Sequence, residues 1–298
     1  MANGIIVKAL SGFYYVKSEQ SEIVECRARG QFKLKGISPL VGDHVSFEYG
    51  ANGSGYVLEV HERKNELVRP PIANVDQVLL VFSAREPNPN QQLLDKFLVH
   101  TAQADLTTHI IFSKCDLLAS EDDDARQEWE QLKRTYTEIG YQVFETARDD
   151  DESLERIRAL FEGKISVLAG QSGVGKSSLL NRISPDLQLQ TQEISQKLGR
   201  GKHTTRHVEL HPFGDDGYIA DTPGFSQLDF FGLSVDQLAE HFFEMAELQD
   251  GCKFRGCSHL HEPSCAVRDA LDAGRIAPSR YESYKHFYNE IKEMKRRY

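Results

Sequence analysis

The chain has no apolar run long enough to cross a membrane. The longest run, residues 78–82, has five residues, whereas a helix that spans a bilayer needs about 20. The first residues also lack a basic segment followed by a long apolar stretch, so the sequence predicts no secretory signal. We therefore expect a cytoplasmic protein that does not associate with membranes.

The sequence also lacks the even set of cysteines that is typical of a small disulfide-linked protein. It has five cysteines, and three of them lie between residues 252 and 265. Disulfides are rare in a reducing compartment, so this crowding indicates a metal site. The other two, Cys26 and Cys115, are expected to be small core residues.

An overall excess of positive charge is missing as well. The net charge of −10 argues against a protein covered with basic side chains for nucleic acid. The charge is uneven, however, because residues 121–162 hold 14 acidic and 6 basic side chains, whereas residues 190–206 hold four basic and one acidic. The last 31 residues hold 8 basic and 5 acidic side chains. A basic partner surface can therefore still form on the last two of these segments.

Short β-strands are the pattern of residues 1–68. Five segments alternate between apolar and polar residues, or are β-branched and aromatic, with Gly, Asn and Ser between them: residues 5–7, 12–16, 22–26, 45–49 and 55–60. Five strands in so short a stretch suit a small barrel of the OB type. An SH3-like barrel would give nearly the same pattern. Arg69-Pro70-Pro71 is stiff and extended, and predicts a domain boundary.

From residue 75 onward, strands alternate with helices. We predict strands at residues 75–83, 109–113, 141–145, 165–169 and 218–220, and helices at residues 93–104, 124–139 and 177–183. This alternation predicts a parallel sheet with helices on both faces. It ends near residues 229–231. The sequence thus predicts three domains: an all-β barrel at residues 1–68, an α/β domain at residues 72–231, and a mostly helical domain around the cysteines at residues 232–298.

A phosphate-binding loop follows the strand at residues 165–169 and opens the next helix. Its residues are Gly170-Gln171-Ser172-Gly173-Val174-Gly175-Lys176-Ser177, followed by Ser178. The glycines let the backbone turn its N–H groups toward a β-phosphate. Lys176 is expected to reach the β- and γ-phosphate oxygens, and the Ser177 hydroxyl is expected to bind Mg²⁺.

A second phosphate motif, Asp221-Thr222-Pro223-Gly224, follows the strand at residues 218–220. Downstream of a phosphate-binding loop, this motif is typical of GTPases. Asp221 is expected to hold Mg²⁺ through a water molecule, and the Gly224 N–H is expected to contact the γ-phosphate. An ordinary turn capped by an aspartate is the alternative.

A guanine-binding segment, Ser113-Lys114-Cys115-Asp116, ends the strand at residues 109–113. The Asp116 carboxylate can accept hydrogen bonds from the N1–H and 2-amino groups of guanine, which adenine lacks. The Lys114 stem can pack along the ring. The usual first residue is Asn or Thr, so Ser113 keeps a hydroxyl but loses the amide that often braces the phosphate-binding loop. Thr146-Ala147, after the next strand, is expected to contact guanine O6 through its backbone, with a plain loop as the alternative.

The order of these motifs is unusual. The guanine-binding segment of a GTPase normally follows the two phosphate motifs, but here it precedes them. The sequence therefore predicts a circularly permuted GTPase that binds GTP or GDP with Mg²⁺.

A glycine-rich basic segment, residues 198–206, lies between the two phosphate motifs and is expected to be a mobile switch loop. Thr205 or Thr204 is expected to close on Mg²⁺ and the γ-phosphate, and we favour Thr205. The residue after Asp-Thr-Pro-Gly is Phe225 rather than a Gln that orients the attacking water, so intrinsic hydrolysis should be slow. Either His203 or a partner is expected to supply the missing polar contact. A role for His203 in capping the loop would account equally well for a histidine at this position.

Three cysteines and a histidine are spaced for a tetrahedral metal site. The candidate ligands are Cys252, Cys257 and Cys265 with His259 or His261. Three thiolates and one imidazole suit structural Zn²⁺ and leave no ligand position open for chemistry. Pro263 is expected to begin the helix that carries Cys265, and Gly274 is expected to end it.

Together these motifs resemble those of the bacterial circularly permuted ribosome-assembly GTPases called RsgA, also YjeQ or YloQ. The likeness covers nearly all 298 residues. It comprises the barrel, Asn74-Val75-Asp76-Gln77, Lys114-x-Asp116, the phosphate-binding loop, Gly199-Arg200-Gly201-Lys202-His203-Thr204-Thr205, Asp221-Thr222-Pro223-Gly224-Phe225 and the cysteine cluster. The family pattern favours His259 over His261 as the fourth metal ligand.

The resemblance implies an OB barrel, a permuted GTPase domain and a zinc domain in a monomer. It also implies binding to the small ribosomal subunit and its rRNA late in maturation, with subunit-stimulated GTP hydrolysis coupled to release. The barrel is the natural RNA contact, helped by aromatics such as Phe13, Tyr14 and Tyr56, unless these fill its core. The residues alone leave two other functions open: a GTP-dependent switch that acts on a protein without RNA, and a nucleic-acid-binding module that does not hydrolyse nucleotide.

Overall fold

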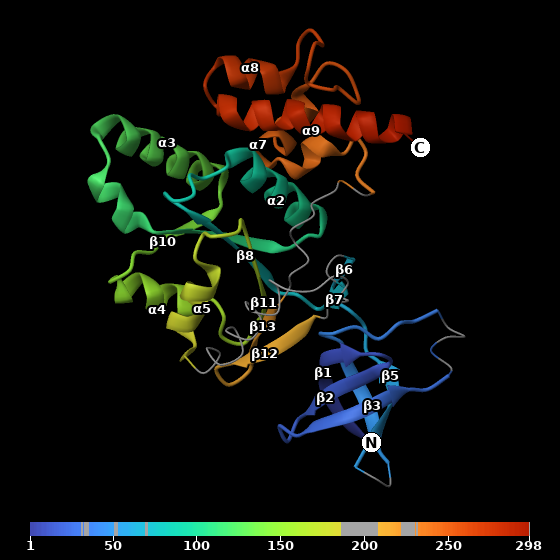
Figure 1. Ribbon diagram of the computed structural model, residues 1–298. Helices are drawn as coiled ribbons and strands as arrows, with labels where there is room; N and C mark the ends of the chain where they lie inside the picture. The colour runs from blue at the N-terminus through green and yellow to red at the C-terminus, as the bar shows by residue number, and fades with distance from the viewer. Residues whose placement is uncertain are drawn as a thin grey trace. The chain divides into compact units, whose positions relative to one another are not determined.

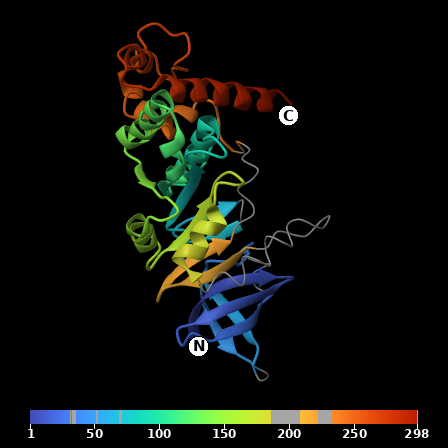
Figure 2. The same ribbon diagram turned by 60° about the vertical axis from the view of Figure 1, so that its left-hand side comes forward.

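The computed structural model describes residues 1–30, 32, 36–50, 53–68, 71–185, 208–221, 230 and 232–297. The chain forms two compact units, whose elements are labelled in Figure 1 and seen from a second direction in Figure 2. The barrel unit comprises Met1–Leu79, Asp149–Ala169 and Gly175–Ser226. The helical unit comprises Leu80–Arg148, Gly170–Val174 and Gln227–Tyr298. Each unit is therefore assembled from separate stretches of the sequence.

The N-terminal part of the barrel unit is a closed five-stranded barrel. Its strands are β1 (Ala2–Leu10), β2 (Phe13–Ser18), β3 (Ile23–Ala28), β4 (His44–Tyr49) and β5 (Gly55–Val60). They are hydrogen-bonded in the order β1-β2-β3-β5-β4, and β1 also pairs with β4. Inward-facing apolar residues fill it: Ile6, Val16, Val24, Cys26, Val45, Phe47 and Val57. This is the OB-type barrel that the sequence predicts.

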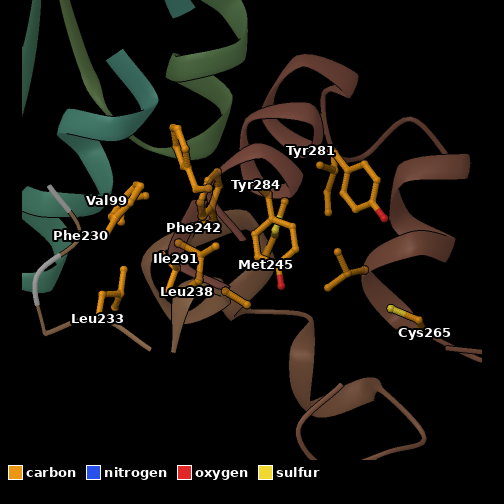
Figure 3. Close-up of a cluster of buried hydrophobic side chains, with 14 of the residues drawn as sticks. Val99, Phe230, Leu233, Leu238, Phe242, Met245, Cys265, Tyr281, Tyr284 and Ile291 are labelled. Carbon is orange, nitrogen blue, oxygen red and sulfur yellow. The ribbon is translucent and has the colours of Figure 1, made fainter. Parts of the chain in front are cut away.

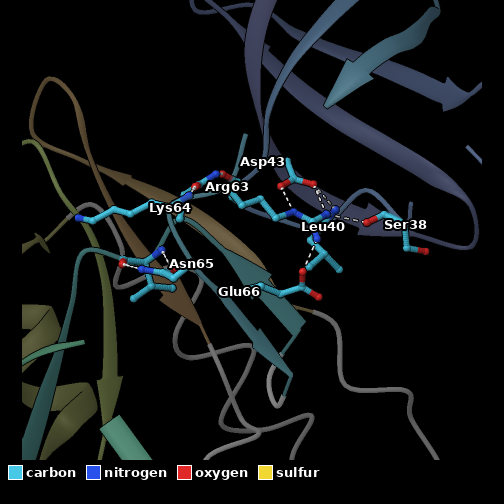
Figure 4. A network of polar contacts seen from close by, with 10 residues as sticks. Ser38, Leu40, Asp43, Arg63, Lys64, Asn65 and Glu66 are labelled. Carbon is cyan, nitrogen blue, oxygen red and sulfur yellow. Dashed lines mark hydrogen bonds and ion pairs between the residues drawn. The ribbon is translucent and has the colours of Figure 1, made fainter. Parts of the chain in front are cut away.

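The segment that leaves the barrel is held by a polar network (Figure 4). The guanidinium of Arg63 forms an ion pair with the fully buried carboxylate of Asp43 (Nε–Oδ1 2.7 Å) and donates a hydrogen bond to the Ser38 carbonyl (2.7 Å). The side-chain amide of Asn74 donates to the Gly42 carbonyl at 2.9 Å. Between these contacts, β6 (Glu66–Val68) and β7 (Pro71–Ala73) form a hairpin. The chain therefore leaves the barrel as ordered structure, although Arg69 and Pro70 lie outside the described residues.

The residues after this hairpin tie the barrel to the second half of its unit. The Asp76 carboxylate accepts a hydrogen bond from the Ile165 N–H at 2.8 Å. The Gln77 amide donates to the Leu160 carbonyl at 2.5 Å and to the Ser166 hydroxyl at 2.8 Å. The motif Asn74-Val75-Asp76-Gln77 thus has a structural role, since its polar side chains bridge two regions that lie far apart in the sequence.

The same unit contains a sheet that continues from the barrel. β11 (Ile165–Ala169) and β13 (Gly217–Asp221) are parallel, and β12 (Glu209–Phe213) is antiparallel to β13. β12 also pairs with β1, where Lys8 and Glu209 form an ion pair at 2.8 Å. The expected purely parallel sheet is therefore wrong at β12. Its five residues join β13 through a tight turn, and a hairpin connection makes the two strands antiparallel.

Helices complete the barrel unit. α4 (Asp151–Ala159) begins at Asp150, whose side chain accepts a hydrogen bond from the Ser153 N–H. α5 (Lys176–Ile183) begins directly after Gly175. An ion pair between Arg182 and Asp151, at 3.4 Å, links the two helices. α5 thus starts at the phosphate-binding loop, as the sequence predicts.

The helical unit begins within β8 (Gln77–Ser83), followed by β9 (Thr107–Ser113) and β10 (Gln142–Glu145), which is parallel to β9. Its first two α-helices are α2 (Gln91–Gln103) and α3 (Asp123–Ile139), and the 3-10 helix η1 (Cys115–Ser120) lies between them in the sequence. Asn90 caps α2 and Asp122 caps α3, each by accepting a backbone N–H. The acidic run at residues 121–124 is therefore explained by helix capping and solvent exposure.

In the described residues, the C-terminal part of the helical unit consists of four short helices and one long helix around a hydrophobic core (Figure 3). These are η4 (Leu238–His241), α7 (Phe243–Ala246), η5 (Gln249–Gly251), α8 (Ala266–Asp272) and the long α9 (Pro278–Arg297). Val99 of α2 belongs to the same core. α8 begins after Cys265, so the prediction that Pro263 begins it is wrong, whereas Gly274 follows its end with φ +71°. None of the helices in the described residues is long and apolar enough to span a membrane.

A buried ion-pair network joins α9 to α2 and α7. Arg280 of α9 is 1% exposed and contacts Asp95 of α2 at 2.5 Å. It also contacts both carboxylate oxygens of Glu244 of α7, at 2.6 and 3.1 Å. The Tyr136 hydroxyl of α3 donates to Asp95 at 2.8 Å. Because buried charges are costly unless they are paired, each partner in this network requires the others.

Replacing Arg280 by methionine should therefore destabilise the helical unit strongly. Arg280→Met leaves the carboxylates of Asp95 and Glu244 buried without their cation, which we expect to cost about 3–5 kcal/mol. Denaturant unfolding followed by Trp129, which packs in this unit against Phe112, measures the effect. The matched control is Lys285→Met, which breaks the exposed ion pair with Glu282 on the same helix and should cost less than about 1 kcal/mol. Equal effects of the two variants would contradict the prediction.

Candidate functional site

The phosphate-binding loop has a backbone that only glycine can adopt at its first position. Gly170 has φ +138°, and a Cβ there would lie 2.0 Å from the Val81 carbonyl oxygen of β8. Gly173 and Gly175 have φ values of +82° and +94°. Any larger residue at Gly170 would collide with β8, and the three positive φ values turn the loop toward the start of α5. The loop therefore has the local form that an anion site requires.

The first residues of α5 carry the side chains expected at the phosphates. Burial lowers the pKa of Lys176, and an anion beside it would raise that pKa again. Ser177 and Ser178 are exposed on the first turn. The positive end of the helix dipole at this turn favours a negative ligand.

The predicted guanine-binding segment is hydrogen-bonded to the phosphate-binding loop. The buried Ser113 hydroxyl donates to the Val174 carbonyl at 2.5 Å. The Lys114 ammonium donates to the Gly173 carbonyl at 2.9 Å, and Lys114 has a left-handed backbone with φ +58°. Ser113 lacks the amide that often braces this loop, but its retained hydroxyl reaches the loop backbone directly.

A segment without a sequence motif contributes to the same place. The Lys114 ammonium also donates to the Glu86 carbonyl, and Pro87 is the nearest neighbour of Gly173, with its Cδ 3.9 Å from an added Cβ. The Ser83 hydroxyl donates to the Pro87 carbonyl at 2.6 Å. Only the position of Glu86-Pro87 directly after β8 could have indicated a role, since strand ends gather at one edge of a parallel sheet.

Asp116 is exposed next to the loop after β10. One of its carboxylate oxygens lies 3.4 Å from the Arg148 N–H. In the same loop, the buried Thr146 accepts a hydrogen bond from the Cys115 N–H at 3.2 Å, and its own N–H donates to the Phe112 carbonyl at 2.8 Å. These bonds hold Thr146-Ala147 beside the guanine-binding segment, as a shared base site requires.

Several predicted residues lie outside the described part of the chain. They are the switch segment at residues 198–206, with His203, Thr204 and Thr205, and the residues Gly224 and Phe225. Asp221 ends β13, and its backbone alone is described.

The four predicted metal ligands lie together in the C-terminal region. The ligand atoms of Cys252, Cys257, His259 and Cys265 all lie within 4.8 Å of one another. His259 Nδ1 is 3.6 Å from Cys252 Sγ and 3.3 Å from Cys265 Sγ. His261 is exposed. Burial raises the pKa of Cys257 to about 12, so the thiolate form needs a cation beside it.

The loop that carries His259 is organised by a carboxylate that no spacing pattern reveals. Glu262 accepts hydrogen bonds from the Ser258 hydroxyl (2.6 Å) and from the backbone N–H groups of Ser258, Leu260 and His261 (2.9–3.2 Å). Burial opposes ionisation of Glu262, but the hydrogen bonds from Ser258 and the backbone outweigh it and lower its pKa to about 2. The Glu262 carboxylate thus fixes the backbone of the loop that carries His259.

Two tyrosines of α9 hold the same loop from the other side. The Tyr281 hydroxyl donates to the His259 carbonyl at 2.6 Å, and the Tyr284 hydroxyl donates to the Ser258 carbonyl at 2.9 Å. These contacts orient the ligand loop against the hydrophobic core.

Known proteins match the whole chain. The family description "RsgA GTPase" matches residues 60–231, and "RsgA N-terminal domain" matches residues 3–57. The chain is 54% identical, over the full length of both proteins, to the small ribosomal subunit biogenesis GTPase RsgA of Bacillus cytotoxicus (strain DSM 22905 / CIP 110041 / 391-98 / NVH 391-98). It is 52% identical, again over both full lengths, to the protein of the same name from Geobacillus sp. (strain WCH70).

The chain belongs to the RsgA GTPase family. Among solved structures it is similar to YloQ, described as a circularly permuted GTPase, with a TM-score of 0.83 at 44% identity over 99% of this chain and 96% of that one. It is also similar to YjeQ from Thermotoga maritima, with a TM-score of 0.84 at 36% identity over 97% of this chain and 98% of that one. Membership of the RsgA GTPase family confirms the predicted enzyme class, a GTP hydrolase with a circularly permuted fold.

Removing the Ser113 hydroxyl should loosen the phosphate-binding loop. Ser113→Ala leaves the Val174 carbonyl without its partner, which we expect to cost about 1–2 kcal/mol and to weaken GDP binding about 5- to 30-fold. Equilibrium titration with a fluorescent GDP analogue measures this change. Ser120→Ala is the control, because that exposed hydroxyl bonds only to the nearby Leu117 carbonyl. GDP affinity unchanged in Ser113→Ala would show that the bond does not support the site.

Changing Glu262 to glutamine should weaken the hold on the metal. Glu262→Gln keeps the shape but replaces one acceptor oxygen by a donor, which would face backbone N–H groups. Loss of such an outer contact typically lowers metal affinity about 10- to 100-fold. The rate of Zn²⁺ transfer to a chromogenic chelator measures the effect, with Glu282→Gln on α9 as the control. Equal transfer rates in both variants would contradict this role of Glu262.

Proposed function

We propose that this protein is a GTPase that binds the small ribosomal subunit during late maturation, and that subunit-stimulated hydrolysis of GTP is coupled to its release. The observation that carries the proposal is the bonding of Ser113 and Lys114 to the phosphate-binding loop. It joins the guanine-binding segment to the phosphate site although the two occur in reversed order. The names of the relatives supply the subunit as partner.

Most nucleotide contacts in this proposal come from the phosphate-binding loop and α5. Backbone N–H groups of Gly170, Gln171, Ser172, Gly173, Val174, Gly175, Ser177 and Ser178 surround the phosphates. Lys176 contacts the β- and γ-phosphate oxygens. The Ser177 hydroxyl and, through a water molecule, Asp221 would hold Mg²⁺, and the Gly224 N–H would contact the γ-phosphate.

Guanine is selected by one carboxylate in this proposal. Asp116 accepts hydrogen bonds from the guanine N1–H and 2-amino group, and the Lys114 stem packs along the ring. Thr146 and Ala147 present backbone groups to O6. The hydrogen bonds that hold this loop beside Cys115 support the assignment. ATP would leave the carboxylate unpaired, so it should compete poorly.

Hydrolysis requires a water-orienting group, since Phe225 stands where a Gln often does. We assign that role to His203 and the contact with Mg²⁺ and the γ-phosphate to Thr205, with Thr204 as the alternative. Phe225 cannot hydrogen-bond water, so turnover without a partner is slow. Mg²⁺ supplies charge neutralisation at the phosphates when it is bound.

The Cys252, Cys257, His259 and Cys265 cluster would hold one structural Zn²⁺. Three thiolates and one imidazole within 4.8 Å fit a tetrahedral ion with no position left for a reacting water. The ion would fix the loops of residues 252–265 against α9. We propose residues 1–68, 72–231 and 232–298 as the functional domains, which serve RNA contact, GTP hydrolysis and zinc binding in that order.

The barrel offers a surface that fits RNA. The Arg27 guanidinium lies 4.6 Å from the centre of the Phe13 ring, and Tyr56, paired with Arg27 across the strands, is 44% exposed. None of Phe13, Tyr14 and Tyr56 belongs to the buried barrel core. Aromatic rings beside a cation on an OB barrel suit single-stranded rRNA. We propose a cytoplasmic monomer that uses this face on the subunit.

Asp116→Asn should change the base preference from guanine to xanthine. The asparagine amide would face the guanine 2-amino group donor to donor, whereas the 2-oxygen of xanthine can accept from it. We expect GTP affinity to fall at least about 100-fold and XTP to bind better than GTP. Competition titrations with GTP, XTP and ATP measure this preference, with the exposed Asp105→Asn as the control. A variant that still prefers GTP would refute the assignment of Asp116.

Turnover with and without purified small subunits tests the function. Strong stimulation of phosphate release by small subunits, and none by large subunits, is the expected result. Slow turnover that responds only to another protein would indicate a switch without an RNA role. A protein that binds GTP but shows no hydrolysis under any condition would indicate a binding module.

The same assay separates the two explanations of His203. His203→Ala should lower subunit-stimulated turnover about 100-fold or more if the imidazole orients the water, while GTP affinity and subunit binding stay near the wild-type values. Single-turnover phosphate release measured on the assembled complex reports the chemical step. Full turnover by His203→Ala with the subunit present would leave only a capping role.

A further inference from the structure

The loop between the first two metal ligands exposes an aromatic ring between two cations. Phe254 is 45% exposed, and its neighbours Lys253 and Arg255 are exposed as well. The Lys253 ammonium lies 5.7 Å from the centre of the ring. In the described residues, Phe254 is not a member of the hydrophobic core that fills this region. The Phe254 ring is therefore outside this core and accessible to a partner.

The backbone under this ring is fixed. Cys252 and Cys257 lie on either side of it in the sequence, and both belong to the metal cluster. The Lys253 N–H donates to the Ser264 carbonyl at 3.2 Å, so the loop is also tied to the segment before Cys265. Gly256, with φ +69°, turns the chain back toward Cys257. A ring on so constrained a loop loses little conformational freedom when it binds a partner.

We propose that Phe254 is a stacking platform for one unpaired RNA base, with Lys253 and Arg255 as contacts to the adjacent phosphates. This inference rests on the proposed function, since the RNA in question is that of the small ribosomal subunit. Bases stack on aromatic rings while basic side chains follow the backbone. The segment from Lys253 to Gly256 has two cations and no acid. That charge favours RNA over a protein pocket, which would hold the ring alone.

Phe243 provides an internal comparison in the same unit. It is exposed to nearly the same extent, 43%, but its neighbours in sequence are the buried Phe242 and the ion-paired Glu244. Its ring stacks on Tyr141 with the centroids 5.1 Å apart. Phe243 thus has a structural contact and no adjacent cation. It serves as the matched control for loss of an exposed phenyl ring.

The test compares small-subunit binding by the zinc-loaded, full-length variants Phe254→Ala and Phe243→Ala. Phe254→Ala should bind at least about 10-fold more weakly, the loss typical when the platform for one base is removed, and Phe243→Ala should bind like the wild type. Zinc content, melting temperature and turnover without subunits should be unchanged in Phe254→Ala. Wild-type affinity in Phe254→Ala overturns this proposal alone, whereas a wild-type protein that does not bind subunits overturns the proposed function.

A tryptophan at the same place reports the stacking directly. Phe254→Trp should bind like the wild type, and its fluorescence should be quenched on the subunit, whereas Trp129 is buried and gives a constant background. The double variant Lys253→Gln/Arg255→Gln should reduce the slope of log affinity against log salt concentration by about 0.7 for each lost phosphate contact. Phe254→Trp that binds without quenching would overturn the proposal.

Photocrosslinking identifies the class of partner. With p-benzoylphenylalanine at position 254, the crosslinked label should be recovered with the RNA of the subunit, and with the same group at position 243 it should not. Recovery of the position-254 label in ribosomal protein would overturn the assignment to RNA.

Discussion

The phosphate-binding loop rests on the backbone of β8 with no space between them. A single methyl group at Gly170 would come within 2.0 Å of the Val81 carbonyl, and bonds from Ser113 and Lys114 hold the loop at Val174 and Gly173. The proposed base site and phosphate site therefore share one loop with fixed geometry. The guanine-binding segment precedes the phosphate-binding loop in this sequence, and the two segments still meet at this loop.

From this loop, a continuous series of contacts leads to the metal-binding region. Glu86 and Pro87 lie beside Lys114 and Gly173, and the chain then enters α2, capped by Asn90. One turn further on, Asp95 holds the buried Arg280 of α9. α9 in turn holds the ligand loop through Tyr281 and Tyr284. The predicted guanine- and phosphate-binding segments are thus connected to the Cys252–Cys265 cluster through α2 and α9, which the buried ion pair between Asp95 and Arg280 joins.

The parts of this structure that sequence predicts are those with local signals. Alternating strands gave the barrel, the glycine-rich loop gave the start of α5, and cysteine spacing gave the ligand cluster. The network around Arg280 gave no such signal, because its partner Asp95 lies far away in the sequence. Neither charged side chain would be expected to be buried without the other. The role of Glu262 could not be predicted either, because it acts through backbone N–H groups. Strand β12 was not predicted because it is short and contains Pro212. For Ser113, the sequence shows that a hydroxyl is present and an amide is not, but only the structure shows that this hydroxyl bonds to the Val174 carbonyl.

Permutation also determines which part of the chain follows the Asp-Thr-Pro-Gly motif. Asp221 ends β13, and after residues 222–229 the chain reaches Phe230, which is 2% exposed. Its ring stacks on His100 of α2 with the centroids 5.2 Å apart and contacts Phe287 of α9 at 5.1 Å. In the usual motif order the chain would return into the GTPase domain at this point. Here only five residues separate Gly224 from Phe230 in the sequence, and the Phe230 ring is fixed between α2 and α9. We propose that a change at the γ-phosphate acts through this short connection on the metal-binding region, because the order of the sequence places the Asp-Thr-Pro-Gly motif and this region so close along the chain.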